Sequence, residues 1–481
     1  MNYYMLAGFY NRGRSAAAGI TNMYASDASG LCSSGQRRQP TFGHLQSFHQ
    51  TIIDIAPILL AAPTALGSSK SIEVLGVDKK WAMGTDQRMF TYDVTPNKAT
   101  NMELQNKKEV TFIENDANSS VVVRIIVKNT STTFVMAASS GMVLMDGMIV
   151  FDSQAVDPRT KAFKRDIFLD PVLLLDWSSW IELVGTSRDD NRSVLADHPI
   201  EQTELMHRSR MSSDFAWFTT DFFLPEASQV LYISVECQMA SAMSFFINGN
   251  YFGTVDHHLH NEGNVNLTMD IRQYFSHGQH TLSLLSESLG YGNLIGRWGA
   301  STTAKTKGIT GNVFIVGREK SGQIFSRALV DGREWLSFPG LHGEYKDGIP
   351  KLGLRHERGL QGEDFSSAPC AWSRALFDTP SFDDTDLSLF LDTSSGRGRI
   401  WLNGHDLGRF WNITKGDTTK YSQQYYFLPH EFLYSNGKLN DLLLFNSLGG
   451  DTTKTKLVLS GIVEDENGNF EDEVDFPGAC I

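Results

Sequence analysis

The chain has 481 residues and a formal net charge of −13, and 41% of its residues are hydrophobic. At roughly 100–200 residues per domain, this length indicates about three or four domains, and the hydrophobic fraction excludes wholesale disorder. The acidic balance argues against nucleic acid or an anionic membrane surface as a partner, because both attract basic proteins.

No stretch reaches the ~18 uninterrupted apolar residues that a membrane span requires. The N-terminus has neither the basic region nor the clean apolar core of a signal peptide, so none is predicted in this chain. The cysteines are scattered without a C-x-x-C pair, at Cys32, Cys237, Cys370 and Cys480. Their spacing favours neither a zinc site nor a disulfide framework.

The first sixty residues have the pattern of one βα unit. Residues 2–6 form a short apolar run, and a small-residue loop follows. Residues 41–60 then carry apolar side chains at near-helical spacing, which predicts an amphipathic helix that Pro57 and Pro63 end. These apolar positions are Phe42, Leu45, Phe48, Ile52, Ile53 and Ile55.

From about residue 70 onward the pattern is typical of β-strands. Residues 121–127, 229–235 and 387–391 are rich in apolar and branched side chains and lie between clusters of Gly, Asn, Asp and Ser. Many short strands separated by turn residues indicate β-sandwiches or jelly rolls.

An internal repeat divides the second half of the chain. The Asn-Gly steps at Asn248 and Asn403 lie 155 residues apart (403 minus 248), and so do Trp217 and Trp372 (372 minus 217). The order of these landmarks predicts two copies of one sandwich, each with a hairpin at its Asn-Gly turn, because both residue types accept positive φ. Two coincidental hairpins are the alternative.

Few segments suggest chemistry by themselves. The cluster at 256–260 (Asp-His-His-Leu-His) has metal-ligand residue types, but an exposed loop is the favoured interpretation, since no second cluster supplies the remaining ligands. No nucleotide-binding, zinc-protease or serine-nucleophile motif is present, so neither cofactor nor metal is predicted. Carboxylates are plentiful, yet none can be paired from sequence as an acid and a nucleophile. The aromatic residues of 401–411 could stack on sugar rings, although filling a sandwich core is favoured.

Five N-x-S/T sequons weakly favour a secretory route. They begin at Asn118, Asn129, Asn191, Asn266 and Asn412.

Ordered motifs resemble plant-type β-galactosidases of glycoside hydrolase family 35. Near the N-terminus these are Asn-Tyr-Tyr-Met (2–5), Asn-Arg-Gly-Arg-Ser (11–15) and Arg-Gln-Pro-x-x-Gly-His-Leu (38–45). The C-terminal copy adds Trp-Leu-Asn-Gly-x-x-x-Gly-Arg-Phe-Trp (401–411), Ser-Gln-x-Tyr-Tyr (422–426) and Gly-Gly-Asp (449–451). The resemblance covers nearly the whole chain and is weakest between residues 65 and 195.

The resemblance implies a mainly β chain that begins in the last βα unit of a (β/α)8 barrel. Residues 1–62 are expected to form this barrel remnant, 65–180 a small β domain, and 181–330 and 331–481 two jelly-roll, galactose-binding-like sandwiches. It also implies retaining hydrolysis of terminal β-galactosyl residues by two glutamates. Because the family's glutamates lie on barrel strands four and seven, both are expected upstream of Met1, and no catalytic residue is predicted here.

The resemblance assigns a few sugar contacts. Tyr4 matches a family tyrosine that contacts galactose, and Tyr24 and Asp27 survive from a second sugar-contacting segment. There Ser26 replaces the family's second tyrosine, a loss expected to weaken galactose binding by about 1–3 kcal/mol. For Tyr4, a buried barrel tyrosine is the alternative.

The first hypothesis is therefore the C-terminal portion of a β-galactosidase, inactive by itself, with galactose-terminated glycans as partners. Its compartment would be extracellular, vacuolar or lysosomal by family. The second is a non-catalytic carbohydrate-binding or scaffold protein built on the two sandwiches. Oligomeric state is not predicted.

Overall fold

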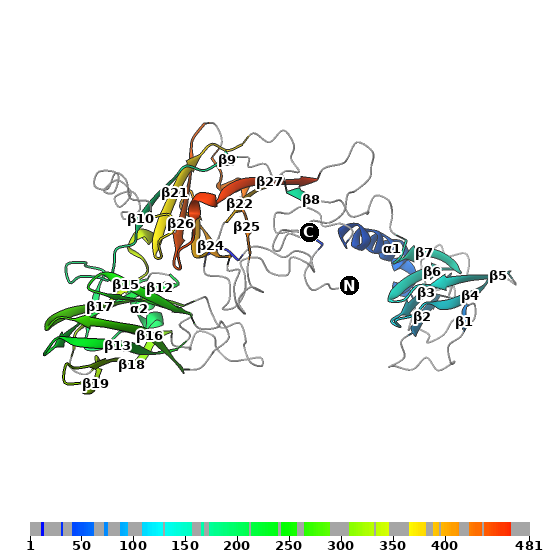
Figure 1. Ribbon diagram of the computed structural model, residues 1–481. Coiled ribbons are helices and arrows are strands. Elements are labelled where there is room, and N and C mark those ends of the chain that lie inside the picture. Colours follow the sequence, from blue (N-terminus) through cyan, green and yellow to red (C-terminus); the bar gives the residue numbers. More distant parts are fainter. Residues whose placement is uncertain are drawn as a thin grey trace. The chain divides into compact units, whose positions relative to one another are not determined.

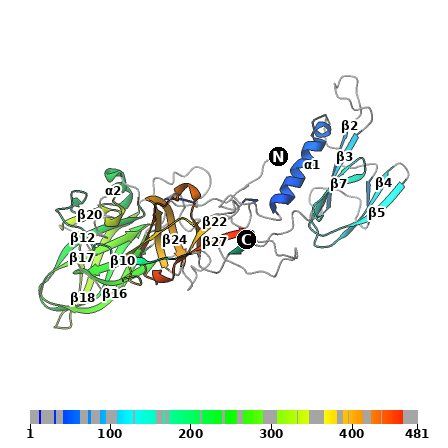
Figure 2. The same cartoon turned by 90° about the horizontal axis from the view of Figure 1, so that it is seen from above.

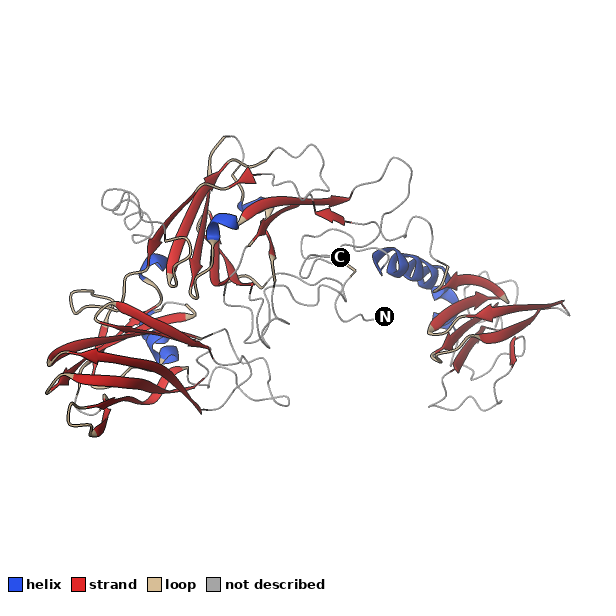
Figure 3. Cartoon of the chain, in the orientation of Figure 1, coloured by secondary structure: helices blue, strands red, loops and turns tan. Residues whose placement is uncertain are grey.

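The computed structural model describes residues 11–13, 30–31, 41–61, 72–75, 87–94, 108–127, 130–155, 165–167, 173–210, 213–238, 242–256, 264–288, 307–330, 333–345, 365–380, 388–393, 396–412, 423–434 and 437–462. Strands make up most of these residues (Figure 3). The chain separates into two compact units. Among the described helices, none combines the length and the apolar character needed to cross a bilayer.

The first unit contains a small β-sandwich and one long helix. Its four-stranded sheet has the order β2-β3-β6-β7, and its three-stranded sheet has the order β1-β4-β5. The helix is α1 (Thr41–Ala61). The strands are β1 (Ile72–Leu75), β2 (Gln87–Val94), β3 (Lys108–Asn115), β4 (Val121–Val127), β5 (Thr130–Met136), β6 (Ser140–Met145) and β7 (Met148–Asp152).

Alternation along β3 and β6 explains how the first unit is layered. Ile113 and Leu144 point toward the three-stranded sheet and form the core between the sheets. Val110 and Val143 point the other way, where α1 covers them with Ile55 and Ile58. Successive side chains of a strand face opposite sides, so one sheet serves two apolar layers. Figure 2 shows α1 running beside β3 and β7.

The helix predicted over 41–60 is confirmed, but the expectation that Pro57 ends it is wrong. Pro57 lies inside α1, which continues to Ala61. A proline removes one backbone hydrogen bond and clashes with the preceding turn. Ile55 and Ile58, on either side of it, are 1% and 5% exposed, so packing on the sheet outweighs that local penalty.

The second unit contains two tandem β-sandwiches (Figure 1). In the first, a six-stranded sheet (β11-β20-β12-β17-β14-β15) faces a four-stranded one (β16-β13-β18-β19). The elements are β11 (Val194–Ala196), α2 (Gln202–Ser209), β12 (Phe215–Leu224), β13 (Ser228–Gln238), β14 (Ala242–Ile247), β15 (Asn250–Asp256), β16 (Asn264–Phe275), β17 (Gly278–Glu287), β18 (Gly308–Arg318), β19 (Ile324–Ala328) and β20 (Trp335–Pro339). Fully buried Phe218, Ile233 and Leu284 lie in the core between these sheets.

The second sandwich pairs the sheet β10-β21-β26-β23-β24 with the sheet β25-β22-β27-β8, and β9 adds to β27. The elements are β8 (Arg165–Ile167), β9 (Leu173–Leu174), β10 (Trp177–Ile181), β21 (Ala371–Phe377), β22 (Ser388–Asp392), β23 (Gly396–Leu402), β24 (His405–Asn412), β25 (Tyr425–Phe427), β26 (Asn440–Asn446) and β27 (Lys456–Ile462). Short 3₁₀ turns occupy His342–Glu344, His430–Phe432 and Thr452–Lys454. Leu389, Ile400 and Leu442 fill the core.

The pairing of β8, β9 and β10 links residues 165–181 to this second sandwich. The domain bounds expected from the sequence place residues 165–180 in the small β domain instead. Such short strands carry little pattern of their own, and they complete sheet edges formed by residues about 200–290 positions away. The division into four domains stays a prediction.

The predicted repeat is confirmed by topology. Strand order β12-β17-β14-β15 recurs as β21-β26-β23-β24, and β16-β13-β18 recurs as β25-β22-β27. The registers agree, because Trp217 lies opposite Leu285 and Trp372 lies opposite Phe445. Both Asn-Gly turns have left-handed backbones, with φ of 52° and 80° at Asn248 and Gly249 and 52° and 81° at Asn403 and Gly404. These are the angles that a two-residue hairpin requires.

The two sandwiches pack on each other through a shared aromatic core. From the first sandwich it contains Phe215, Trp217, Phe246 and Leu285, and their repeat equivalents Cys370, Trp372, Trp401 and Phe445 come from the second. Phe215 and Phe445 meet edge to face with ring centroids 5.1 Å apart. Equivalent faces of the two copies therefore meet at this interface.

Candidate functional site

The outer face of the six-stranded sheet continues beyond the aromatic core as a polar surface. On β12, Phe215 and Trp217 point toward the second sandwich, and Thr219 and Asp221 are the next residues on that face. The same change occurs on β17, where Leu285 is followed toward the strand start by Ser283 and Thr281. One sheet face thus joins a buried interface to a solvent-facing site.

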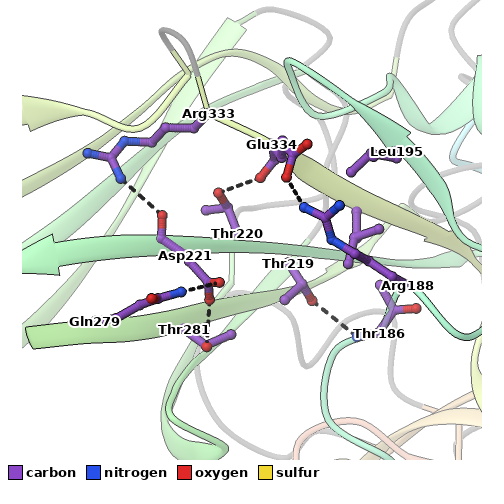
Figure 4. A pocket seen from close by; sticks show the side chains of 11 residues that line it. Thr186, Arg188, Leu195, Thr219, Thr220, Asp221, Gln279, Thr281, Arg333 and Glu334 are labelled. Atoms are coloured by element: carbon purple, nitrogen blue, oxygen red, sulfur yellow. Dashed lines mark hydrogen bonds and ion pairs between the residues drawn. The ribbon is translucent and has the colours of Figure 1, made fainter.

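A pocket of about 540 Å³ lies on this polar surface. Strands β11, β12, β17 and β20 and the loop before β11 supply its walls (Figure 4). Its lining residues are Thr186, Arg188, Leu195, Thr219, Thr220, Asp221, Gln279, Thr281, Arg333, Glu334 and Leu336. Pockets that bind small molecules generally span about 300–1,000 Å³.

Asp221 is the hub of the pocket's hydrogen bonds. Gln279 Nε2 donates to Oδ2 and Thr281 Oγ1 donates to Oδ1, both at 2.7 Å. Arg333 Nη1 donates to the Asp221 carbonyl oxygen at 3.0 Å. Figure 4 shows these groups converging from neighbouring strands. The carboxylate is solvent-exposed yet held in one orientation, so it can accept bonds from a ligand without first being ordered.

An ion pair joins the other side of the pocket. Arg188 contacts Glu334 through its guanidinium, and Thr220 Oγ1 donates to the Glu334 carbonyl oxygen at 2.8 Å. Thr219 Oγ1 accepts from the Thr186 backbone N–H at 3.2 Å, which ties the loop to β12. With two arginines and two acids, the lining has no net charge.

The second copy does not reproduce this arrangement. By register, Arg374 and Asp441 stand where the first sandwich has Thr219 and Thr281. They form a bidentate ion pair with both N–O distances at 2.9 Å. Leu376 replaces Asp221 and is 51% exposed. The polar hub is therefore particular to the first sandwich.

Buried charges hold the sandwiches together beside this site. Glu182, 2% exposed, accepts from Trp217 Nε1 at 3.4 Å, from Trp372 Nε1, and from the His342 N–H at 2.6 Å. Burial raises the pKa of its carboxyl above the ordinary value, and the charge of His342 opposes that shift. One carboxylate thus bridges the two repeat-equivalent tryptophans.

Two arginines of β23 also make ionic contacts across the interface. Arg397 Nη2 lies 2.9 Å from Glu287 Oε2, and Arg399 Nη1 lies 2.6 Å from Asp214 Oδ2. The side chains of Arg399 and Asp214 are 1% and 2% exposed, which closes this pair to a substrate. Removing one partner of either pair would leave a buried charge without its counter-ion, which is strongly destabilising.

Glu344 lies beside this network. Its Oε2 accepts from Ser213 Oγ at 2.6 Å and from the Leu341 N–H at 2.8 Å. Removal from water raises the pKa of Glu344 to about 7, although the positive charge of Arg399 works against the shift. The described cysteines, Cys237 and Cys370, are free and buried.

The sequence-predicted sugar contacts Tyr4, Tyr24 and Asp27 lie outside the described residues, as does Ser26. Of the 256–260 cluster, only Asp256 is described. The assignment of sugar contacts to Tyr4, Tyr24 and Asp27 stays a prediction.

The aromatic residues of 401–411 fill the core, the interpretation that the sequence favours. Trp401, Phe410 and Trp411 are 9%, 1% and 5% exposed. A sugar ring cannot stack on rings packed in this way.

Sequence reasoning missed Asp221, Gln279 and Thr281. A signal was present in β12, whose outward positions change from Phe215 and Trp217 to Thr219 and Asp221. That change marks where the interface ends and a polar surface begins. The partners on β17 follow only from its pairing with β12.

Comparisons with known proteins agree with this architecture. Residues 370–438, which run from β21 through β25, match the family model described as the β-galactosidase, galactose-binding domain. The fold is that of a tandem β-sandwich protein, and a segment of its second sandwich resembles a galactose-binding domain.

Over most of its length the chain is similar to plant β-galactosidases. It is 23% identical to "Beta-galactosidase 14" of Arabidopsis thaliana, over 94% of this chain and 46% of that protein. It is 25% identical to "Beta-galactosidase 3" of Oryza sativa subsp. japonica, over 94% of this chain and 51% of the relative. "Beta-galactosidase 7" of the same rice is 27% identical over 57% of this chain and 33% of the relative. The resemblance to a C-terminal portion of plant β-galactosidases is thereby confirmed.

The chain spans between a third and about half of the length of these relatives. Among solved structures, a lectin from Pleurotus ostreatus in complex with GalNAc is 10% identical, over 61% of this chain and 80% of that chain. Its TM-score is 0.19, too low to carry an argument.

Proposed function

We propose that this chain is the C-terminal, sugar-binding portion of a β-galactosidase-like glycoside hydrolase that removes terminal β-galactosyl residues with retention. The observation that carries the proposal is the family match at 370–438, which falls on the second of two matching sandwiches. The similarity to plant β-galactosidases over 94% of the chain supports it.

In this proposal the chain supplies binding and not the chemical step. A retaining glycosidase needs two carboxyl groups about 5–5.5 Å apart on either side of the sugar. Asp214, beside Arg399, is instead ion-paired and 2% exposed between the sandwiches, and Asp406 is ion-paired with the same arginine. Both catalytic glutamates belong to a barrel of which residues 1–62 form the last βα unit.

The helix α1 supports this barrel assignment. It occupies the place of the last barrel helix in the motif order, directly after the Arg-Gln-Pro segment. Ile53 and Leu60 are 64% and 85% exposed on it, although their side chains are apolar. These two residues are seven positions apart and so lie on one face of the helix, which in this proposal would pack against the rest of the barrel.

Hydrolysis of a chromogenic β-galactoside by the purified chain tests where the chemical step takes place. We expect no turnover, because the two glutamates are assigned elsewhere. Turnover that survives repurification would contradict this placement.

Reading the codons in frame before Met1 tests the family assignment. Seven further βα units with glutamates ending strands four and seven would support it.

A non-catalytic carbohydrate-binding protein is the second candidate, and the polar pocket of the first sandwich favours it. A stop codon shortly before Met1, together with sugar binding by the chain, would support this candidate against the first.

A secretory route, toward the cell wall, vacuole or lysosome, goes with the family proposal. The sequon residues Asn118, Asn191 and Asn266 are exposed, as glycan attachment requires. The expected partners are galactose-terminated glycans.

A further inference from the structure

We propose that the pocket centred on Asp221 is a second sugar-binding site, which takes one neutral hexopyranose unit of an oligosaccharide. It lies on residues 186–336 of the first sandwich, outside the segment that matches the galactose-binding family model. The proposal goes beyond hydrolysis, because it needs no catalytic group and would hold for a purely binding protein.

The charged side chains that line the pocket indicate that its ligand is neutral. The positive charges of Arg188 and Arg333 are balanced by Asp221 and Glu334, and the Arg188–Glu334 contact is a direct ion pair. A phosphate, sulfate or uronate would meet two carboxylates in the same cavity, and a cation would meet two guanidinium groups. A ligand without charge avoids repulsion from groups of like charge and the cost of desolvating its own charge.

Among neutral ligands, the hydrogen-bonding groups of the pocket favour one with several hydroxyl groups. The Asp221 carboxylate offers about four lone-pair sites, and Gln279 and Thr281 occupy one on each oxygen. The remaining sites can accept from two adjacent hydroxyl groups at once. The guanidinium groups of Arg188, beside Glu334, and Arg333, beside the Asp221 carbonyl oxygen, supply hydrogen-bond donors in the same lining.

The apolar part of the pocket lining also suits a pyranose ring. Leu195, 46% exposed, and Leu336 line one wall, and their methyl groups suit the C–H face of a pyranose ring. The lining of this pocket, as given by the described residues, contains no aromatic ring. Without a stacking platform, the expected dissociation constant lies in the millimolar range.

The test is a titration of the full chain with galactose, β-1,4-galactobiose and galacturonate. Binding is monitored through the backbone amide NMR signals of Thr219 and Thr281. We expect saturable shifts of both amides at millimolar galactose or galactobiose and weaker binding of galacturonate. Unchanged amides at tens of millimolar neutral sugar would overturn the proposal. Tighter binding of galacturonate would overturn the assignment to neutral sugars.

Asp221→Asn supplies the matched variant. It keeps the side-chain shape but replaces one acceptor oxygen with a donor, and about tenfold or greater loss of affinity is expected. Asp270→Asn is the control, because Asp270 is an exposed carboxylate on β16 that pairs with Arg272 away from the pocket. Equal affinity in Asp221→Asn and the unaltered chain would place the bound sugar elsewhere.

If Asp221→Asn fails to fold, Gln279→Ala removes an exposed pocket donor and is expected to weaken binding several-fold. No loss of affinity in a folded Gln279→Ala would then overturn the proposal. These experiments measure sugar affinity and not hydrolysis. A negative result would therefore refute the binding site without bearing on the proposed β-galactosidase function.

Discussion

At the residue scale, the two Asn-Gly turns show why asparagine stands where it does. Asn403 N donates to the Asp441 carbonyl oxygen, and its Oδ1 accepts from the Asp441 N–H, both at 2.8 Å. Asn248 makes the same two bonds with Thr281, at 2.9 and 3.0 Å. Each side chain therefore fastens its hairpin to the neighbouring strand and tolerates the left-handed backbone.

Two substitutions at Asn403 separate the contribution of its side-chain hydrogen bond from that of its left-handed backbone. Asn403→Ala loses the bond to Asp441 and places a methyl-bearing residue at a φ of 52°, so we expect it to cost about 2–4 kcal/mol of unfolding free energy. Asn403→Gly loses the bond but not the backbone compatibility, and is expected to cost about 1–2 kcal/mol less than the alanine variant. Urea unfolding measures both. Equal costs would show that backbone strain is unimportant at this turn.

The residue scale is also where prediction from sequence was most uneven. The Asn-Gly steps could be assigned because the turn's requirement is local and only a few residue types meet it. Asp221, Gln279 and Thr281 could not, because their meeting depends on the register between β12 and β17. An exposed aspartate and glutamine resemble ordinary surface residues until that register is known.

At the element scale, the 3₁₀ turn His342–Glu344 places a carboxyl group next to buried charges. Arg399, Asp406, Ser213 and the Leu341 amide are the groups that set the charge state of Glu344. Because the folded pKa of Glu344 is about 7 against 4.5 for the ordinary group, the folded state holds a proton that the unfolded state has released. Stability should therefore fall as pH rises from about 4.5 through 7.

Glu344→Gln tests this pH dependence. The glutamine keeps an oxygen for Ser213 and Leu341 but cannot ionise, so it should remove up to about 3 kcal/mol of the stability loss between pH 4.5 and 8. The measurement is the unfolding free energy of both proteins across that range. Parallel pH profiles for the two proteins would contradict a raised pKa at this position.

Elements differed in how well the sequence predicted them. The helix at 41–60 and the strands at 121–127, 229–235 and 387–391 follow from periodicity, and the structure has all of them. The end of α1 did not follow, because packing of Ile55 and Ile58 overrides Pro57. The partners of β8, β9 and β10 did not follow either, since two to five residues carry too little pattern to identify a sheet.

At the scale of the whole molecule, the two sandwiches are expected to unfold together. Their shared core contains Trp217 and Trp372, both fully buried, and two buried ion pairs cross the interface. Separating the sandwiches would expose these apolar rings to water, which is unfavourable. The segment 165–462, expressed alone, should therefore show one cooperative transition.

Circular dichroism and tryptophan fluorescence measure that transition by independent probes. Coincident curves are expected, because the fluorescence of Trp217 and Trp372 reports the interface and the dichroism reports the strands of both sandwiches. An earlier fluorescence transition with intact strands would show instead that the sandwiches part before they unfold.

The meeting of equivalent faces has a consequence for the form of the interface. Trp217 and Trp372 occupy the same position in the two copies and share the carboxylate of Glu182, and Glu287 contacts its own repeat equivalent, Ser447. A surface that packs on a copy of itself is the mark of a two-fold dimer. Within one chain, the two sandwiches therefore meet in the way that the subunits of a two-fold dimer meet, and the polar pocket lies on the first of them.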